Sequence, residues 1–168
     1  MERHLTGTGF VVHEGRTALH WHRKNRMWLP AGGHIEPGED PVQATLREIR
    51  EEFAIEAEVL RLAPPVAYEG GPEQLEPPFT ILLEDVDGCG RTPDGSAVHI
   101  DLIYFCRAVS GYPGVSHDPE HPIVWLDADE LATGTSLVDG VEAPFPPDVQ
   151  ALGLEAIRLA AAVPAGTP

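Results

Sequence analysis

The sequence predicts one domain over residues 1–168 in the α/β class, with an α+β or sandwich arrangement. Two observations predict this. Runs rich in β-branched and aromatic residues occur beside amphipathic helical patterns, but the two do not alternate as regular βαβ units do. The chain of 168 residues, 42% of them apolar, is also long enough for one hydrophobic core, and no repeat or low-complexity linker divides it.

The N-terminal half is expected to hold three strands and one helix. Residues 6–13 and 14–22 indicate two strands that are joined by a turn at Glu14-Gly15. After the helix, residues 55–69 contain a third strand that we expect to end near Pro64, because consecutive prolines interrupt strand pairing.

The C-terminal half is expected to hold a hairpin, a further strand and two helices. Residues 77–86 and 97–109 are apolar runs, and the turn-rich residues 87–95 between them favour a hairpin with a long loop. Residues 121–134 indicate a strand that runs into a short helix. Residues 146–163 predict a closing helix, with one apolar face made of Val149, Leu152, Ala156 and Leu159.

The helix of the N-terminal half has clear start signals. Asp40 is a favourable N-cap, Pro41 suits the first helical position, and Gln43 completes a capping box. Apolar residues then recur at steps of three and four, which predicts one buried stripe. This stripe consists of Val42, Leu46, Ile49 and Phe53.

Three glutamates on this helix break two local rules. Glu48, Glu51 and Glu52 are three or four residues apart, so like charges become neighbours on the helix surface. They also lie in the last turns, where the helix dipole favours cations. A solvated acidic face is one interpretation. The other is a functional site at which a divalent cation compensates the charge, since Mg²⁺ and Mn²⁺ prefer oxygen ligands.

Composition limits the partners of the chain. Its 27 acidic and 11 basic residues give a net charge of −16, which argues against a nucleic-acid polymer as partner. No apolar stretch is long enough to span a membrane and the start does not look like a signal peptide, so we expect a cytoplasmic protein without a membrane partner. Cys89 and Cys106 are too few for a disulfide framework.

A longer pattern surrounds the glutamates. From Gly33 the order is Gly, five residues, Glu39, seven residues, Arg47-Glu48-Ile49, one residue, Glu51-Glu52, one residue, and Ala54-Ile55. This closely resembles the signature of the Nudix hydrolase family, with eight of its nine type-defined positions matched. The departure is Ala54, where the family has a glycine that ends the helix. We expect positive φ at this alanine.

The resemblance implies a Nudix-type α/β/α sandwich with a mixed sheet and a role for each motif residue. Such enzymes hydrolyse a nucleoside diphosphate linked to another group X, a small-molecule diphosphate substrate, with Mg²⁺ or Mn²⁺ as cofactor. Glu48, Glu51 and Glu52 would be catalytic residues and metal ligands, with Glu48 as the base candidate within the motif. The carbonyl of Gly32 often supplies a further ligand in such loops.

The remaining motif residues would support this site. Arg47 would orient the glutamates through ion pairs, with direct phosphate contact as its rival role. Glu39 would hydrogen-bond within the loop, although a plain surface acid is about as good an interpretation. Gly33 and Gly38 would allow the tight backbone that the loop needs.

Residues outside the motif leave several alternatives open. Some family members take the base from another loop, for which the candidates here are Glu69, Glu73, Glu76, Asp118 and Glu120. His20 and His22 could touch phosphates or lie on a strand surface. His99 and Asp101 share one strand face and could support the site. Asp148 could contact a base, although capping the last helix is its favoured role.

Two other functions compete with hydrolysis. A diphosphate isomerase of related fold needs a cysteine and a glutamate at the reacting carbon, and neither cysteine has a recognisable context for this. A ligand-sensing domain that lost catalysis would typically also lose motif glutamates, which this chain keeps. The identity of X and the oligomeric state stay open, with a homodimer as one option.

Overall fold

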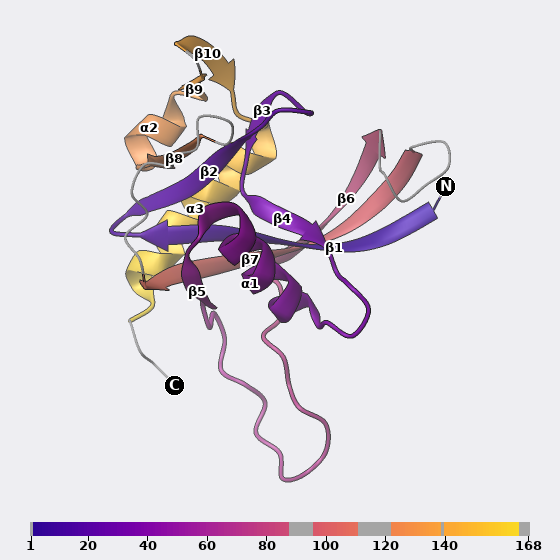
Figure 1. The fold of residues 1–168 in the computed structure, drawn as a ribbon. Helices are drawn as coiled ribbons and strands as arrows, with labels where there is room; N and C mark the ends of the chain where they lie inside the picture. The colour runs from indigo at the N-terminus through magenta and orange to yellow at the C-terminus, as the bar shows by residue number, and fades with distance from the viewer. Residues whose placement is uncertain (1, 88–95, 111–121, 139, 165–168) are drawn as a thin grey trace.

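A computed structural model describes residues 2–87, 96–110, 122–138 and 140–164, and Figure 1 shows its fold. The strands are β1 Glu2–His13, β2 Arg16–His22, β3 Met27–Leu29, β4 Ala31–His34, β5 Glu56–Val59, β6 Thr80–Asp87, β7 Ser96–Ser110, β8 Ile123–Leu126, β9 Thr135–Val138 and β10 Val141–Pro144. The helices are α1 Pro41–Phe53, α2 Ala128–Ala132 and α3 Pro147–Ala162.

One large mixed sheet organises the fold. Its main path runs β3-β2-β1-β7-β5, while β4 pairs with β1, β6 with β7 and β8 with β2. The central strands β1 and β7 run parallel over eleven paired positions, from Glu2↔Ala97 to Val12↔Arg107. The other pairs in this sheet are antiparallel. Two segments far apart in sequence therefore form the centre of the molecule.

Two hydrophobic cores lie on opposite faces of this sheet, because successive strand residues point to opposite sides. Phe10 and Phe105 belong to the core that includes Val149 and Ala156 of α3. Their chain neighbours Val11, Tyr104 and Cys106 belong to the core that includes Ile49 and Phe53 of α1. Helices on both faces make an α/β/α sandwich, and Figure 1 shows α1 and α3 on either side of the central strands. The expected fold class is confirmed.

Two glycines of β1 allow α1 to approach the sheet closely. A Cβ at Gly7 would lie 2.6 Å from Oγ1 of Thr45, and a Cβ at Gly9 would lie 2.6 Å from Cδ1 of Ile49. Real Cβ atoms essentially never come so close, so a larger residue at either position would force Thr45 or Ile49, or the helix that carries them, to shift. This close packing fixes the height at which α1 carries its glutamates above the sheet.

Most predicted elements form, with corrected bounds. The β1–β2 hairpin turns at Glu14 and Gly15, whose φ angles are 46° and 76°. Residues 77–86 and 97–109 pair as the predicted antiparallel β6–β7 hairpin. The third predicted strand corresponds to β5, which ends at Val59 rather than near Pro64. The short strands β3, β4, β9 and β10 are not predicted by the sequence. None of the described helices is long and apolar enough to cross a membrane.

Candidate functional site

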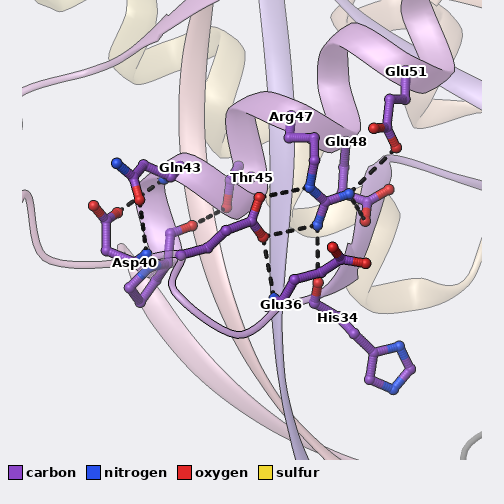
Figure 2. A network of polar contacts seen from close by, with 10 residues as sticks. His34, Glu36, Asp40, Gln43, Thr45, Arg47, Glu48 and Glu51 are labelled. Carbon is purple, nitrogen blue, oxygen red and sulfur yellow. Dashed lines mark hydrogen bonds and ion pairs between the residues drawn. The ribbon is translucent and has the colours of Figure 1, made fainter.

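Helix α1 begins as the sequence predicts. The side chain of Asp40 accepts a hydrogen bond from the Gln43 N–H (2.9 Å), and the Asp40 N–H donates to Oε1 of Gln43 (3.0 Å). Figure 2 shows both contacts of this capping box. Of the predicted stripe, Ile49 and Phe53 are buried, whereas Val42 and Leu46 are half-buried and pack against the same core.

The helix ends at Ala54 in the left-handed conformation, with φ of 56° and ψ of 36°. Its N–H still donates to the Arg50 carbonyl (3.0 Å). The positive φ predicted for Ala54, which stands where the motif has glycine, is thus confirmed. An alanine adopts this backbone at a cost of roughly 1–2 kcal/mol.

Arg47 connects the loop before α1 with two of the glutamates (Figure 2). Its Nη1 lies 2.7 Å from Oε1 of Glu48 and 3.3 Å from Oε2 of Glu51. Its Nε and Nη2 bind the two oxygens of Glu39 at 2.7 and 3.1 Å. Its Nη2 also donates to the His34 carbonyl (3.0 Å). The guanidinium therefore holds both glutamates and the entry loop in one network.

Glu39 fixes the loop itself. One of its oxygens accepts from the Glu36 N–H (3.1 Å), and hydrogen bonds from Arg47 lower the pKa of its carboxyl. Gly38 beside it has φ of 93°, a conformation that suits glycine. The loop-steadying contacts that the sequence suggested for Glu39 are present.

The carboxylates of Glu48 and Glu52 face the strand that precedes the loop. A Cβ on Gly33 would collide with the carboxylate of Glu48, so a larger residue there would displace this carboxylate from its position. Oε2 of Glu52 accepts from the Gly32 N–H (3.1 Å) and lies 3.7 Å from Nε2 of His20. Burial is the main cause that raises the pKa of Glu52 to about 7; the hydrogen bond from Gly32 opposes the increase, and the charges of Glu48 and Glu51 add to it.

A pocket of about 270 Å³ opens beside Glu52. We call the side formed by α1 and β4 the helix wall, with Gly32, Gly33 and Glu52. We call the side formed by β1, β6 and β7 the sheet floor; its polar residues are Thr6, Thr8, Glu84, His99 and Asp101. Helix α3 closes the pocket with Asp148, Val149 and Leu152.

The sheet floor holds a buried carboxylate with its own hydroxyl partners. Asp101, 6% exposed, accepts from Oγ1 of Thr6 (2.8 Å) and from Oγ1 of Thr8 (2.8 Å to Oδ2 and 3.0 Å to Oδ1). Burial raises the pKa of Asp101, and the two threonines oppose the increase. Burial together with Asp101 and Asp148 raises the pKa of Glu84 to about 7.

The structure brings the predicted residues of strand β2 and of helix α3 together at one pocket. His20, His22 and Asp148 all line the pocket. The favoured capping role of Asp148 is wrong, because Pro146 is the N-cap of α3 and no side chain caps that helix. Among residues that the sequence analysis missed, Thr6 and Thr8 stand out. Their alternation on β1 could have indicated a shared face, but not the partner strand.

The candidates for a base outside the motif do not lie at the pocket. Glu69, Glu73 and Glu76 belong to the loop between β5 and β6, which projects away from the sheet in Figure 1, and none of them lines the pocket. Glu76 is instead bound by Nε of Arg61 (2.6 Å). Asp118 and Glu120 lie outside the described residues.

Comparison with known proteins decides the family. The model of the NUDIX domain matches residues 3–145 of this chain. The chain belongs to the NUDIX domain family. Its mixed sheet between helices is the fold of that family, and its motif lies on the loop and helix where the glutamates gather.

Solved NUDIX structures share this fold. A NUDIX-family hydrolase from Clostridium perfringens matches with a TM-score of 0.68 at 23% identity, over 95% of this chain and 99% of that one. A MutT NUDIX hydrolase from Burkholderia pseudomallei matches with a TM-score of 0.54 at 19% identity, over 93% and 98% of the two chains.

One curated relative matches a short segment. Bis(5'-nucleosyl)-tetraphosphatase [asymmetrical] from Mus musculus is 49% identical over 35 residues. The match covers 21% of this chain and 24% of the mouse protein. The likeness to that protein is thus confined to about a quarter of its length.

Proposed function

We propose that this NUDIX domain is a metal-dependent hydrolase that cleaves the pyrophosphate linkage of a nucleoside diphosphate joined to another group. The observation that carries the proposal is the arrangement of three glutamates around Arg47 and the Gly32–Gly33 backbone. A solvated acidic face would not need an arginine held by five contacts or a glycine that makes room for a carboxylate.

The donor set fits Mg²⁺ or Mn²⁺. Glu48, Glu51 and Glu52 offer carboxylate oxygens, and Gly32 offers its carbonyl, all of which are hard ligands. The raised pKa of Glu52 reflects a buried negative charge beside two others, which a divalent cation would compensate. Such an ion, when bound, would neutralise the diphosphate and acidify an attacking water.

The side chains divide the work of hydrolysis. Glu48 would take the proton from the water whose oxygen attacks phosphorus, and the bridging P–O bond would break, with its electron pair going to the oxygen of the leaving phosphate. Arg47 would keep Glu48 and Glu51 in place, since it already bonds to both. Glu48 is the base that we favour, because its carboxylate lies against Gly33, which lines the pocket, whereas Glu69, Glu73 and Glu76 belong to the loop between β5 and β6.

The pocket beside Glu52 would hold the substrate. His20 and His22 on β2 and Asp148 on α3 line it and would contact phosphates or the base. A volume of about 270 Å³ lies near the lower end for small-molecule sites, so it suits one nucleoside rather than a polymer. The short match to a bis-nucleosyl tetraphosphatase supports a nucleotide substrate class.

Isomerisation is less well supported. Cys106 is fully buried in the core below α1, and burial raises the pKa of its thiol well above the usual range. Such a thiol cannot reach a substrate in the pocket, and Cys89 lies outside the described residues.

We also propose that residues 1–168 act as one domain on a small molecule, as the sequence analysis expects.

A substrate screen tests the proposed function. Purified protein with Mg²⁺ or Mn²⁺ is given nucleotides, dinucleotides and sugar nucleotides, and the phosphate products are identified. We expect hydrolysis of at least one diphosphate-linked compound, its loss in EDTA, and its return with Mg²⁺ or Mn²⁺. Full activity in metal-free buffer would rule out the glutamate site, and inactivity toward every such compound would favour a ligand-sensing domain.

A further inference from the structure

Three histidines from three strands meet at the edge of the sheet floor. His4 of β1, His34 of β4 and His99 of β7 each place one ring nitrogen within 4.8 Å of the other two. His4 and His99 are directly paired in the parallel β1–β7 register, and His34 pairs with Thr6, two residues along β1. We call these three residues the histidine cluster.

The geometry of the histidine cluster is close to that of a metal site. Nδ1 of His4 and Nε2 of His34 form a hydrogen bond of 3.2 Å, which an ion shared by the two rings would replace. Two nitrogens bound at 2.0–2.1 Å to one tetrahedral ion would be about 3.3–3.4 Å apart. The third ring lies nearby, with its centroid 4.8 Å from that of His34 and 6.0 Å from that of His4. The ligand atoms of all three rings lie within 4.8 Å of one another, so binding one ion would require side-chain rotations that shorten the longest of these separations.

His99 has an unused polar atom. Its Nε2 is buried and has no hydrogen-bond partner within the part of the chain that the structure describes. A buried polar nitrogen without a partner costs free energy, so such atoms usually indicate a missing water or ion. A metal ion could take up a lone pair of this ring.

The surrounding charges favour a cation. Glu84 is the register partner of His99 on β6, and Asp101 lies two residues from His99 on the same strand face. Asp148 of α3 lines the same pocket, and its charge raises the pKa of both Glu84 and Asp101. The cluster therefore borders a group of carboxylates that an added positive charge would stabilise.

We propose that His4, His34 and His99 bind a transition-metal ion of the Zn²⁺ class, at a site separate from the glutamates of α1. Neutral imidazoles select Zn²⁺ and its neighbours, whereas Mg²⁺ prefers the oxygens of the helix wall. Three protein nitrogens leave a fourth position for water or for an oxygen of a pocket-bound molecule, because His34 and His99 line the pocket.

The site would also connect the sheet floor to the helix wall. His34 accepts a hydrogen bond from Arg47 through its carbonyl, and it directly follows Gly32 and Gly33. An ion on its ring would tie β4 to β1 and β7 by side chains as well as by backbone pairing. We therefore expect Zn²⁺ to raise the melting temperature of the protein.

The test uses tag-free, metal-stripped protein in excess Mg²⁺, so that the glutamates are occupied. Co²⁺ is titrated as a spectroscopic probe and then displaced by Zn²⁺. We expect one equivalent to bind, with visible d–d bands of a nitrogen-ligated ion. Loss of one outer hydrogen-bond partner of a ligand already costs about 10–100-fold in affinity, so His34→Gln or His99→Gln should cost more than about 100-fold.

Matched variants separate this site from others. His13→Gln changes a β1 histidine outside the cluster and should bind Co²⁺ like the wild type. If circular dichroism shows that His99→Gln does not fold, the Co²⁺ titration is made on His4→Gln instead. Absence of one-equivalent binding, or unchanged affinity in the folded cluster variants, would overturn the proposal. The proposal would also be overturned if the d–d bands of bound Co²⁺ were lost in Glu52→Gln but kept in His34→Gln. None of these readouts depends on hydrolysis.

Discussion

The helix wall and the sheet floor each present a carboxylate to the same pocket, but Glu52 is half-buried, Asp101 is buried, and the two carboxylates have different partners. Glu52 on the helix wall accepts one backbone N–H and has two glutamates near it. Asp101 on the sheet floor accepts from the hydroxyls of Thr6 and Thr8. Burial raises the pKa of both groups.

The different partners of Glu52 and Asp101 indicate different roles for the two carboxylates. Asp101 is nearly satisfied by its own neighbours, so it can hold strands β1 and β7 together without any ligand. Glu52 is half-buried, accepts only one backbone N–H and lies 3.7 Å from His20, so a cation from outside the chain would stabilise its ionised form. A substitution at Glu52 should therefore affect chemistry, and one at Asp101 should affect stability.

The largest expected effect is on the helix wall. Glu52→Gln or Glu48→Gln should lower kcat by roughly 10²–10⁴, the size of a lost general base or ligand, and should leave the fold intact. Steady-state kinetics with saturating Mg²⁺ on the best substrate measures this. Asp101→Asn keeps an acceptor oxygen for the threonines and should stay within about tenfold of the wild type.

Equal losses of kcat in Glu52→Gln and Asp101→Asn would contradict these separate roles, because both carboxylates would then act on the substrate. Near-wild-type turnover of both glutamate variants would instead make the helix wall a solvated acidic face. Circular dichroism on each variant separates lost chemistry from lost structure.

The sequence predicts the helix α1 side of the site better than the sheet floor. Helix α1, which carries Glu52 of the helix wall, is local: Asp40, Gln43, the glutamates and Ala54 lie within fifteen residues, and rules of capping and helical spacing describe them. The sheet floor depends on parallel pairing of β1 with β7, which brings Thr6 to Asp101 across 95 residues. Strand alternation could predict that His99 and Asp101 share a face, but no local pattern indicates that His4 and His34 join them.

The second effect concerns the stability of the sheet floor. Asp101→Ala leaves the hydroxyls of Thr6 and Thr8 without this acceptor and should destabilise the fold by about 1–3 kcal/mol. For a chain of this size the melting temperature should fall by roughly 2–12 °C in a thermal melt. Asp101→Asn should recover most of the loss. A wild-type melting temperature for Asp101→Ala would show that the threonines find other partners.

The third effect is the pH dependence of stability in the metal-free protein. The folded pKa of Glu52, about 7, exceeds its unfolded value of 4.5, so its contribution is fully present below pH 4.5 and is lost as pH rises through 7. Glu52→Gln mimics the protonated form. In EDTA at pH 8 it should be more stable than the wild type by roughly 1–3 kcal/mol, and the gap should close toward pH 4.5.

Urea unfolding at several pH values measures this gap. Mg²⁺ at pH 8 should narrow it, because a cation stabilises the ionised wild-type carboxylate and not the amide. A constant gap from pH 4.5 to 8 would mean that glutamine acts through packing rather than charge.

The smallest effect tests the end of α1, just after the helix wall. Ala54→Gly should relieve roughly 1–2 kcal/mol of left-handed strain, while the extra freedom of glycine in the unfolded chain offsets about 0.4–1 kcal/mol. The net is a small stabilisation, measurable as a slightly higher urea midpoint with unchanged slope. Turnover should not change, because the packing of α1 on Gly7 and Gly9 sets the position of the glutamates, and that packing is untouched. If α1 instead continues through residue 54 in solution, Ala54→Gly should lower the free energy of unfolding by about 0.5–1 kcal/mol. A changed kcat would show that the end of α1 helps to position the catalytic glutamates.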